Sequence, residues 1–136
     1  MNKPLSDQRV AQVTLGNERQ RIAMVRGQSL LTDPSAEGDG GFKSGELLLM
    51  ALGSCVAGRL RTHFDKASLA SDGLQVEVQH TPNEASDEPS EIVVTLGMHK
   101  PADPVEAESL MSVALSGNVG RRLARCGNLT VRFKDQ

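Results

Sequence analysis

The feature that most constrains this chain is an apolar stretch near its middle, "GELLLMALGSCVAGRL". It predicts a long helix over residues 44–69, with Ser44 as the N-cap and Glu46 in the first turn, where a carboxylate favours the exposed N–H groups. Residues 47–52 are all apolar and point in every direction around the helix axis. A helix that is apolar on all sides is expected to be buried on all sides. Beyond Gly58 the pattern becomes amphipathic, so the far end should emerge into solvent.

A helix of this kind needs more cover than the rest of the chain offers. The chain has 136 residues, of which 38% are hydrophobic, and this is typical of one globular domain, residues 1–136. Such a domain cannot easily surround a long helix that is apolar on all sides. We therefore expect a homodimer in which two such helices are sandwiched between two sheets.

Alternation of apolar and polar residues predicts strands on both sides of the helix. A second helix should open at Asp103 with Pro104 at its first position, stop near "SGN", and resume over residues 119–125. Hairpins rather than alternating strand–helix units predict an α+β fold in the order β-β-β-α-β-β-α-β, with largely antiparallel sheets. The predicted strands cover residues 11–15, 20–27, 28–33, 74–78, 92–98 and 129–133.

Turns and connectors complete this outline. Gly16-Asn17 and Gly27 supply the turns between the first strands. Residues 33–45 are rich in Gly and small polar residues, so they are interpreted as a loop that forms a functional rim. The acidic connector over residues 82–90 is interpreted as a solvated hairpin loop.

Charge and residue usage exclude several classes of function. The formal net charge is -2 and the three aromatic residues are all Phe, so no nucleic acid partner is expected. The chain lacks a run of ~20 apolar residues and a secretion-signal core, which favours a cytoplasmic protein with no membrane partner. His and Cys show no zinc-type spacing, and neither a metal nor a cofactor is expected. Cys55 and Cys126 are too few for a disulfide framework and are expected to be free thiols.

The stretch "GQSLLTDPSAEGDGGFKSGELLLMALGSCVAGRLR" resembles the OsmC/Ohr family of osmotically induced and organic hydroperoxide resistance proteins, whose segment commonly runs G-P-T-P-x-E-L-L-L-A-A-L-G-x-C-T-A-x-x-L-R. The similarity continues through "DGLQVEVQH" and the "VGRRL" helix. The matching residues are Gly41, Glu46, Leu47, Leu48, Leu49, Ala51, Leu52, Gly53, Cys55, Ala57, Leu60 and Arg61.

The resemblance implies an OsmC-like fold, with sheets wrapped around the long central helices of an intertwined homodimer. It also implies thiol-dependent reduction of organic hydroperoxides in an oxidative stress response. Cys55 falls on the peroxidatic cysteine, which attacks the peroxide. Glu46 falls on the glutamate of an Arg-Glu pair that supports the attacking thiolate. The family arginine comes from the N-terminal part, where Arg19, Arg21 and Arg26 are all candidates.

The chain departs from the family pattern at its second cysteine. The family run C-P-V-H-R-T-L aligns with "GNVGRRL", so Gly117 stands where the resolving thiol is expected. Cys126 lies nine residues further on and could resolve Cys55 only if the two Cα atoms came within about 7 Å. Phe42 and Ser44 replace the usual prolines of the rim.

Peroxide cleavage by sulfur needs a thiolate, a nearby positive charge and a pocket that admits the peroxide. Arg59 is four residues after Cys55 on the same helical face, and is either a substitute charge partner or the first solvent-facing residue of the emerging end. Glu46 precedes Cys55 by nine residues, which places the two on opposite sides of a straight helix, so Glu46 is expected to act near the partner's active site. Without the family pattern, Glu46 would be interpreted as a first-turn dipole residue and Cys55 as a buried structural thiol.

Two functions are consistent with this pattern. The first is a thiol peroxidase that reduces organic hydroperoxides through a Cys55 sulfenic acid, which an external thiol or Cys126 then reduces. The alternative is a non-catalytic dimer that binds a small apolar ligand at its interface. Arg61 and His63 are interpreted as helix-surface residues. The methionines at positions 50, 98 and 111 are interpreted as core filler.

Overall fold

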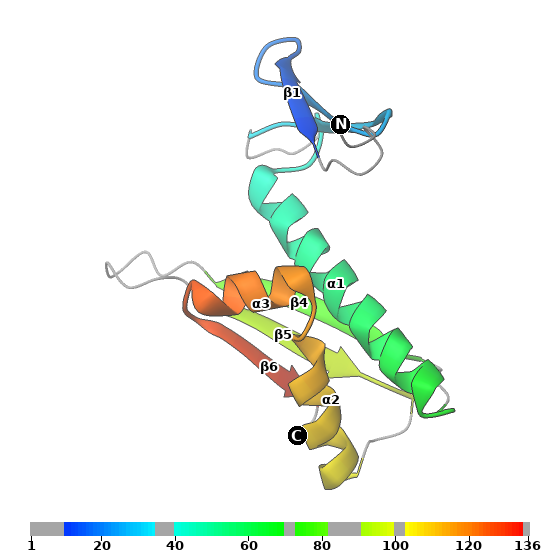
Figure 1. The fold of residues 1–136 in the computed structure, drawn as a ribbon. Coiled ribbons are helices and arrows are strands. Elements are labelled where there is room, and N and C mark those ends of the chain that lie inside the picture. Colours follow the sequence, from blue (N-terminus) through cyan, green and yellow to red (C-terminus); the bar gives the residue numbers. More distant parts are fainter. Residues whose placement is uncertain (1–9, 35–39, 70–72, 82–90, 100–102, 135–136) are drawn as a thin grey trace. The chain divides into compact units, whose positions relative to one another are not determined.

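The computed structural model describes residues 10–34, 40–69, 73–81, 91–99 and 103–134 (Figure 1). It confirms the predicted α+β fold and the order of its elements, with the last helical stretch divided in two. The elements are β1 (Ala11–Leu15), β2 (Arg21–Val25), β3 (Gln28–Thr32), α1 (Ser44–Lys66), β4 (Gln75–Thr81), β5 (Glu91–Gly97), α2 (Pro104–Ala114), α3 (Asn118–Arg125) and β6 (Leu129–Phe133). The chain forms two compact units, Met1–Leu48 and Leu49–Gln136.

The first unit contains the antiparallel sheet β1-β2-β3. The turn after β1 closes through a hydrogen bond from the Gly16 N–H to the Gln20 carbonyl, 2.8 Å. The turn between β2 and β3 has φ 51° at Arg26 and 77° at Gly27. Positive φ at both central residues is typical of a two-residue hairpin turn whose twist matches that of the strands. Both turns lie where the glycines predicted them.

This sheet has little core of its own. Among the described residues of the first unit, Thr32 is the one buried side chain, at 5% exposure. Apolar side chains on each strand and in the following loop are exposed instead, including Val13, Leu15, Leu31 and Phe42. A three-stranded sheet needs a covered apolar face for stability, so this unit requires cover from outside itself.

The start of α1 differs by one residue from the sequence prediction. The first helical hydrogen bond runs from the Leu47 N–H to the Lys43 carbonyl, 3.2 Å, so Lys43 rather than Ser44 is the N-cap. The Glu46 carboxylate Oε1 accepts a hydrogen bond from the Lys43 N–H, 2.7 Å. This is the glutamate half of a capping box, in which an N3 carboxylate satisfies the N-cap donor.

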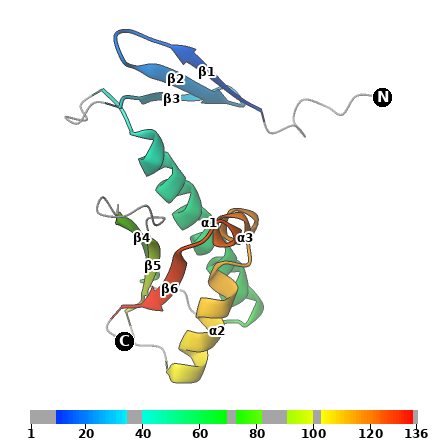
Figure 2. The same cartoon turned by 90° about the vertical axis from the view of Figure 1, so that its left-hand side faces the viewer.

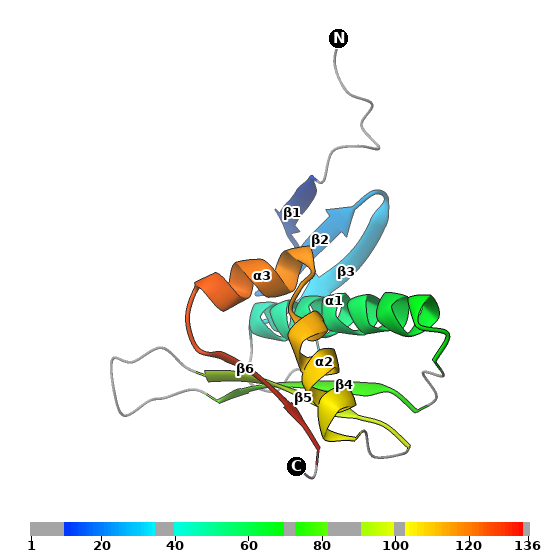
Figure 3. The same ribbon diagram turned by 60° about the horizontal axis from the view of Figure 1, so that its bottom comes forward.

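The second unit contains the sheet β4-β5-β6. β4 and β5 pair antiparallel, whereas β5 and β6 pair parallel. A parallel pair requires a crossover connection, and α2 and α3 provide it. Figures 2 and 3 show that the helices of this unit lie on one face of the sheet. Three of the four pairings between described strands are thus antiparallel, in line with the prediction.

The core of the second unit forms between α1 and this sheet. Residues spaced by four along α1 are fully buried, because they form one stripe on the helix surface. Partners from the sheet and α2 complete the core. Its members are Leu52, Val56, Leu60, Phe64, Val94, Leu96, Ala107, Leu110, Ala114 and Phe133.

The prediction that α1 is buried on all sides is wrong for the chain taken alone. Leu48 is 45% exposed and Met50 is 52% exposed, because only the stripe at four-residue spacing faces the core. Met50 is therefore not core filler within the chain. Met98 and Met111 are partly buried and pack against the core, as expected.

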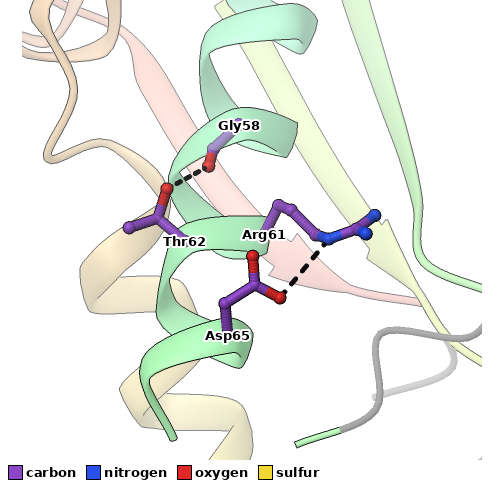
Figure 4. A network of polar contacts seen from close by, with 4 residues as sticks. All are labelled: Gly58, Arg61, Thr62 and Asp65. Carbon is purple, nitrogen blue, oxygen red and sulfur yellow. Dashed lines mark hydrogen bonds and ion pairs between the residues drawn. The ribbon is translucent and has the colours of Figure 1, made fainter. Parts of the chain in front are cut away.

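The far end of α1 is amphipathic, as predicted: Arg61 and Lys66 on its polar face are exposed, whereas Leu60 and Phe64 are fully buried in the core. Figure 4 shows the polar contacts of this part, where Arg61 and Asp65 form an exposed ion pair at 3.5 Å. The Thr62 hydroxyl donates to the Gly58 carbonyl, 3.1 Å. Exposed pairs of this kind add little stability, so the buried stripe is what attaches α1 to its unit.

Two sequence predictions fall outside this description. The acidic connector over residues 82–90 and residues 35–39 of the rim loop lie outside the described residues. The edges of the rim loop are described: Gly41 has φ 148° and lies against the Leu31 carbonyl, a position that only glycine fits. None of the helices described here combines the length and apolarity that a membrane span requires.

Candidate functional site

Cys55 lies on the fourth turn of α1, immediately before the core residue Val56. Its side chain is half-buried and its thiol is free. The buried stripe fixes the rotation of α1 about its axis, because Leu52 and Val56 must face the sheet. Cys55 is consequently held at the edge of the core, partly open to solvent.

The residue that faces the Cys55 sulfur is Gly117, which is itself buried. A Cβ atom at position 117 would lie 2.6 Å from Cys55 Sγ, a distance that real Cβ atoms essentially never show. The Gly117 backbone has φ -78° and ψ 172°, which any residue can adopt. Space beside the sulfur, and not backbone conformation, therefore favours glycine at this position.

Arg59 occupies the same small space. Its Cγ and Cδ lie 2.9 and 3.3 Å from the position of that missing Cβ, so the stem of Arg59 passes over Gly117 beside the sulfur. Its guanidinium Nε donates a hydrogen bond to Ser116 Oγ, 3.1 Å. The Ser116 hydroxyl in turn donates to the Val113 carbonyl at the end of α2, 2.6 Å. The junction between α2 and α3 thus holds the stem of Arg59 against Gly117, the residue that faces the Cys55 sulfur.

The N-terminus of α3 adds a second source of positive potential. Gly117 is the N-cap of α3 and its carbonyl accepts from the Arg121 N–H, 2.9 Å. No side chain caps this end, and the first N–H groups of a helix have no acceptor within the helix. Exposed N–H groups and the helix dipole favour an anion at this end. Cys55 Sγ lies beside Gly117, the N-cap residue of this helix.

Cys126 lies at the opposite end of α3. It is exposed, and its thiol contacts the Arg122 carbonyl at 3.4 Å. The eight residues of α3 span about 12 Å, and Gly117 at the start of the helix is the residue that meets Cys55. Both cysteines are free thiols in the structure.

The remaining predicted site residues belong to the first unit. Glu46 caps α1 through Lys43, as described above. Arg26 is exposed at the β2–β3 turn. Arg21 is half-buried, and its Nε donates to the Thr32 hydroxyl on β3, 3.0 Å. The contacts given for these three residues are therefore contacts within the first unit.

Beyond these residues, the second unit offers an open apolar groove between α1 and β4. The groove has a volume of about 340 Å³. It is lined by Leu49, Met50, Gly53, Ser54, Val76 and Val78. In the part of the chain that the structure describes, no three His, Cys, Asp or Glu side chains gather where they could hold a metal ion.

Sequence reasoning placed Arg59 beside Cys55 but did not find Ser116. The signal that could have found it is the break "SGN" between two helical stretches, because such a break brings polar side chains and free N–H groups to one point. What the sequence lacks is any sign that this break packs against the turn of α1 that carries Cys55.

Comparison with known proteins agrees with this geometry. The model of the OsmC-like protein family matches residues 36–117, which include Glu46, Cys55 and Arg59 and end at Gly117. The match covers more than half of the chain, and the chain belongs to the OsmC-like family. A search of curated proteins gave no significant match.

Several solved structures share the fold. An OsmC-like protein from Mycoplasma pneumoniae matches with a TM-score of 0.79 and 14% sequence identity, covering 94% of this chain and 95% of that one. An organic hydroperoxide resistance protein OsmC from Legionella pneumophila matches with a TM-score of 0.70 and 12% identity, covering 93% and 96%. The organic hydroperoxide resistance protein OhrB of Bacillus subtilis matches with a TM-score of 0.65 and 15% identity, covering 92% and 98%.

Proposed function

We propose that the protein is a thiol peroxidase that reduces organic hydroperoxides with Cys55 as the attacking thiol. One observation carries the proposal: the Cys55 sulfur and the stem of Arg59 both lie against Gly117, the N-cap of α3. A fixed cation and a helix N-terminus are the surroundings that stabilise a thiolate and a departing alkoxide. The hydroperoxide resistance proteins from Legionella and Bacillus share the fold.

The proposed reaction is a two-electron oxidation of sulfur. The Cys55 thiolate attacks one peroxide oxygen, an S–O bond forms, and the O–O bond breaks. The leaving alkoxide takes a proton from water, so that the products are an alcohol and the Cys55 sulfenic acid. In this proposal the guanidinium of Arg59 and the N–H groups of α3 stabilise the negative charge that moves from sulfur to oxygen.

The sulfenic acid then condenses with an external thiol, which releases water and leaves a mixed disulfide. A second thiol displaces Cys55 and regenerates it. We assign this role to an external reductant because Gly117 carries no thiol and Cys126 lies one helix length away. The proposal places the protein in the cytoplasm, where small and protein thiols are kept reduced.

A homodimer is part of the proposal. The apolar face of the first sheet, Leu48 and Met50 are exposed in the single chain, and a second copy of the chain is the proposed cover. In such a dimer, Glu46 would orient an arginine beside Cys55 of the partner. The Lys43 cap uses only Oε1 of Glu46, so the second oxygen can accept from a guanidinium. Arg26 is the proposed arginine of the first unit, alongside Arg59 on α1.

The test is a thiol count after mixing the reduced protein with cumene hydroperoxide. We expect the natural sequence and Cys126→Ser each to lose one thiol per chain rapidly. Cys55→Ser, which retains only the Cys126 thiol, should show no such rapid loss. Turnover with a dithiol reductant should follow the same pattern. Unchanged thiol counts together with no turnover would rule out the peroxidase.

The apolar groove between α1 and β4 supports the alternative function, a non-catalytic dimer that binds a small apolar ligand. The same experiment separates the two functions, because a ligand-binding dimer needs no reactive sulfur. If that alternative holds, Met50→Glu should abolish binding of an apolar fluorescent probe, whereas Cys55→Ser should leave it unchanged.

A further inference from the structure

Ser116 links Arg59 to the end of α2. It accepts from Arg59 Nε at 3.1 Å and donates to the Val113 carbonyl at 2.6 Å. The donated bond fixes the direction of the hydroxyl hydrogen, which leaves an oxygen lone pair for the guanidinium. Ser116 therefore acts as an oriented acceptor.

Gly117 supplies the other half of this arrangement. The stem of Arg59 lies 2.9 Å from the place of its missing Cβ, so any side chain at position 117 would displace it. The Ser116 hydroxyl and the Gly117 backbone together form the contact site of the Arg59 side chain. This contact site belongs to the α2–α3 junction and not to the helix that carries Arg59 and Cys55.

This contact site restricts Arg59, because a surface arginine otherwise moves among many rotamers. Arg59 is exposed, and an unrestrained exposed cation has only a weak, screened effect on a neighbouring group. A hydrogen bond at Nε restricts the side chain while leaving the terminal nitrogens of the guanidinium available. The Arg59 side chain is then held against Ser116 and Gly117 before any substrate arrives.

We infer that Ser116 is a positioning residue that acts on Cys55 through Arg59. The inference rests on the proposed function for its catalytic meaning, but its physical content can be tested without peroxide. A fixed cation near Cys55 Sγ should attract an anionic alkylating agent more than a neutral one. The ratio of the alkylation rates with iodoacetate and iodoacetamide therefore reports the position of the guanidinium.

The experiment measures this ratio in a Cys126→Ser background, in which Cys55 is the remaining thiol. Ser116→Ala should lower the ratio about two- to fivefold, as expected for loss of one exposed charge contact. Ser116→Thr keeps a hydroxyl and should restore most of the ratio. Ser112→Ala is the matched control, because the Ser112 hydroxyl also donates to a carbonyl of α2, that of Ser109 at 2.8 Å, and it should leave the ratio unchanged.

A double-mutant cycle tests the route of the effect. In an Arg59→Met background, Ser116→Ala should cause no further change in the ratio, because the group it positions is gone. An unchanged ratio in Ser116→Ala, or an equal fall in the Arg59→Met background, would overturn the inference. Cumene hydroperoxide oxidation of Cys55 is measured separately. If Cys55 is oxidised but Ser116→Ala leaves the alkylation ratio unchanged, the inference alone is refuted. If Ser116→Ala lowers the ratio but Cys55 is not oxidised, only the peroxidase is refuted.

Discussion

At the scale of single residues, the approach of Gly117 to Cys55 distinguishes this chain from the two-cysteine pattern that its sequence resembles. The backbone at position 117 lies close to Cys55 Sγ, since a Cβ there would be 2.6 Å away and would need a small shift to carry a disulfide partner. The position lacks a thiol but is the residue that faces the Cys55 sulfur. Arg59 fills the space that a side chain at position 117 would take.

Gly117→Cys should therefore create a disulfide with Cys55. In a Cys126→Ser background, one equivalent of hydroperoxide should remove both remaining thiols, because a sulfur–sulfur bond of about 2.05 Å is within reach once the Arg59 stem moves. Mass spectrometry of the non-reduced protein measures the intramolecular bond. Ser112→Cys, on the exposed side of α2, is the control and should keep one thiol free. Intermolecular disulfides alone in Gly117→Cys would contradict the geometry.

At the scale of elements, α1 has two tasks that depend on different residues. The stripe Leu52, Val56, Leu60 and Phe64 attaches it to the sheet of the second unit. Its first turn depends on Glu46, which caps Lys43. In the proposed function the same carboxylate also orients an arginine. Capping needs only an oxygen acceptor, whereas orienting an arginine needs a negative charge.

We expect Glu46→Ala to reduce the free energy of unfolding by about 1 kcal/mol, the usual cost of a lost cap. Glu46→Gln retains an oxygen acceptor and should recover most of this loss in urea denaturation. The Gln variant should still oxidise Cys55 more slowly, since it has no charge to orient an arginine. Glu108→Ala, at an exposed position on α2, controls for removal of a surface carboxylate. Equal stability of all variants would show that the cap contributes nothing.

At the scale of the whole molecule, the single chain leaves too much apolar surface uncovered. Val13, Leu15 and Phe42 in the first unit and Met50 on α1 are all 44% or more exposed. Large apolar side chains exposed in each unit are candidates for contact with another chain. A second copy of the chain is the cover that we propose.

Light scattering should give twice the mass of the 14.5 kDa chain. Met50→Glu places a charge on the uncovered part of α1 and should weaken the dimer at least tenfold in its dissociation constant, because an unpaired charge is costly to bury. Val105→Glu is the matched control: Val105 is 79% exposed at the start of α2, where a carboxylate is favourable. A monomeric natural protein would refute the proposed dimer.

Much of the secondary structure can be predicted from the sequence. The strands, the turns at Gly16 and Gly27, and the long helix with its amphipathic end depend on residues a few positions apart. Periodicity reports such local preferences directly. The burial of α1 could not be predicted in this way, because six consecutive apolar residues show no preferred face. Packing against β5 and α2 selects the stripe that includes Leu52.

The candidate residue Cys55 and its neighbour Arg59 could be identified from the sequence, since both lie on one face of one helix. The residues that surround them could not be predicted. Arg59 meets Ser116 across a separation of 57 residues, and Gly117 meets Cys55 only because the parallel β5–β6 pair requires a crossover that turns at this point. Contacts between residues distant in sequence depend on how the elements pack, and local pattern carries no record of that packing.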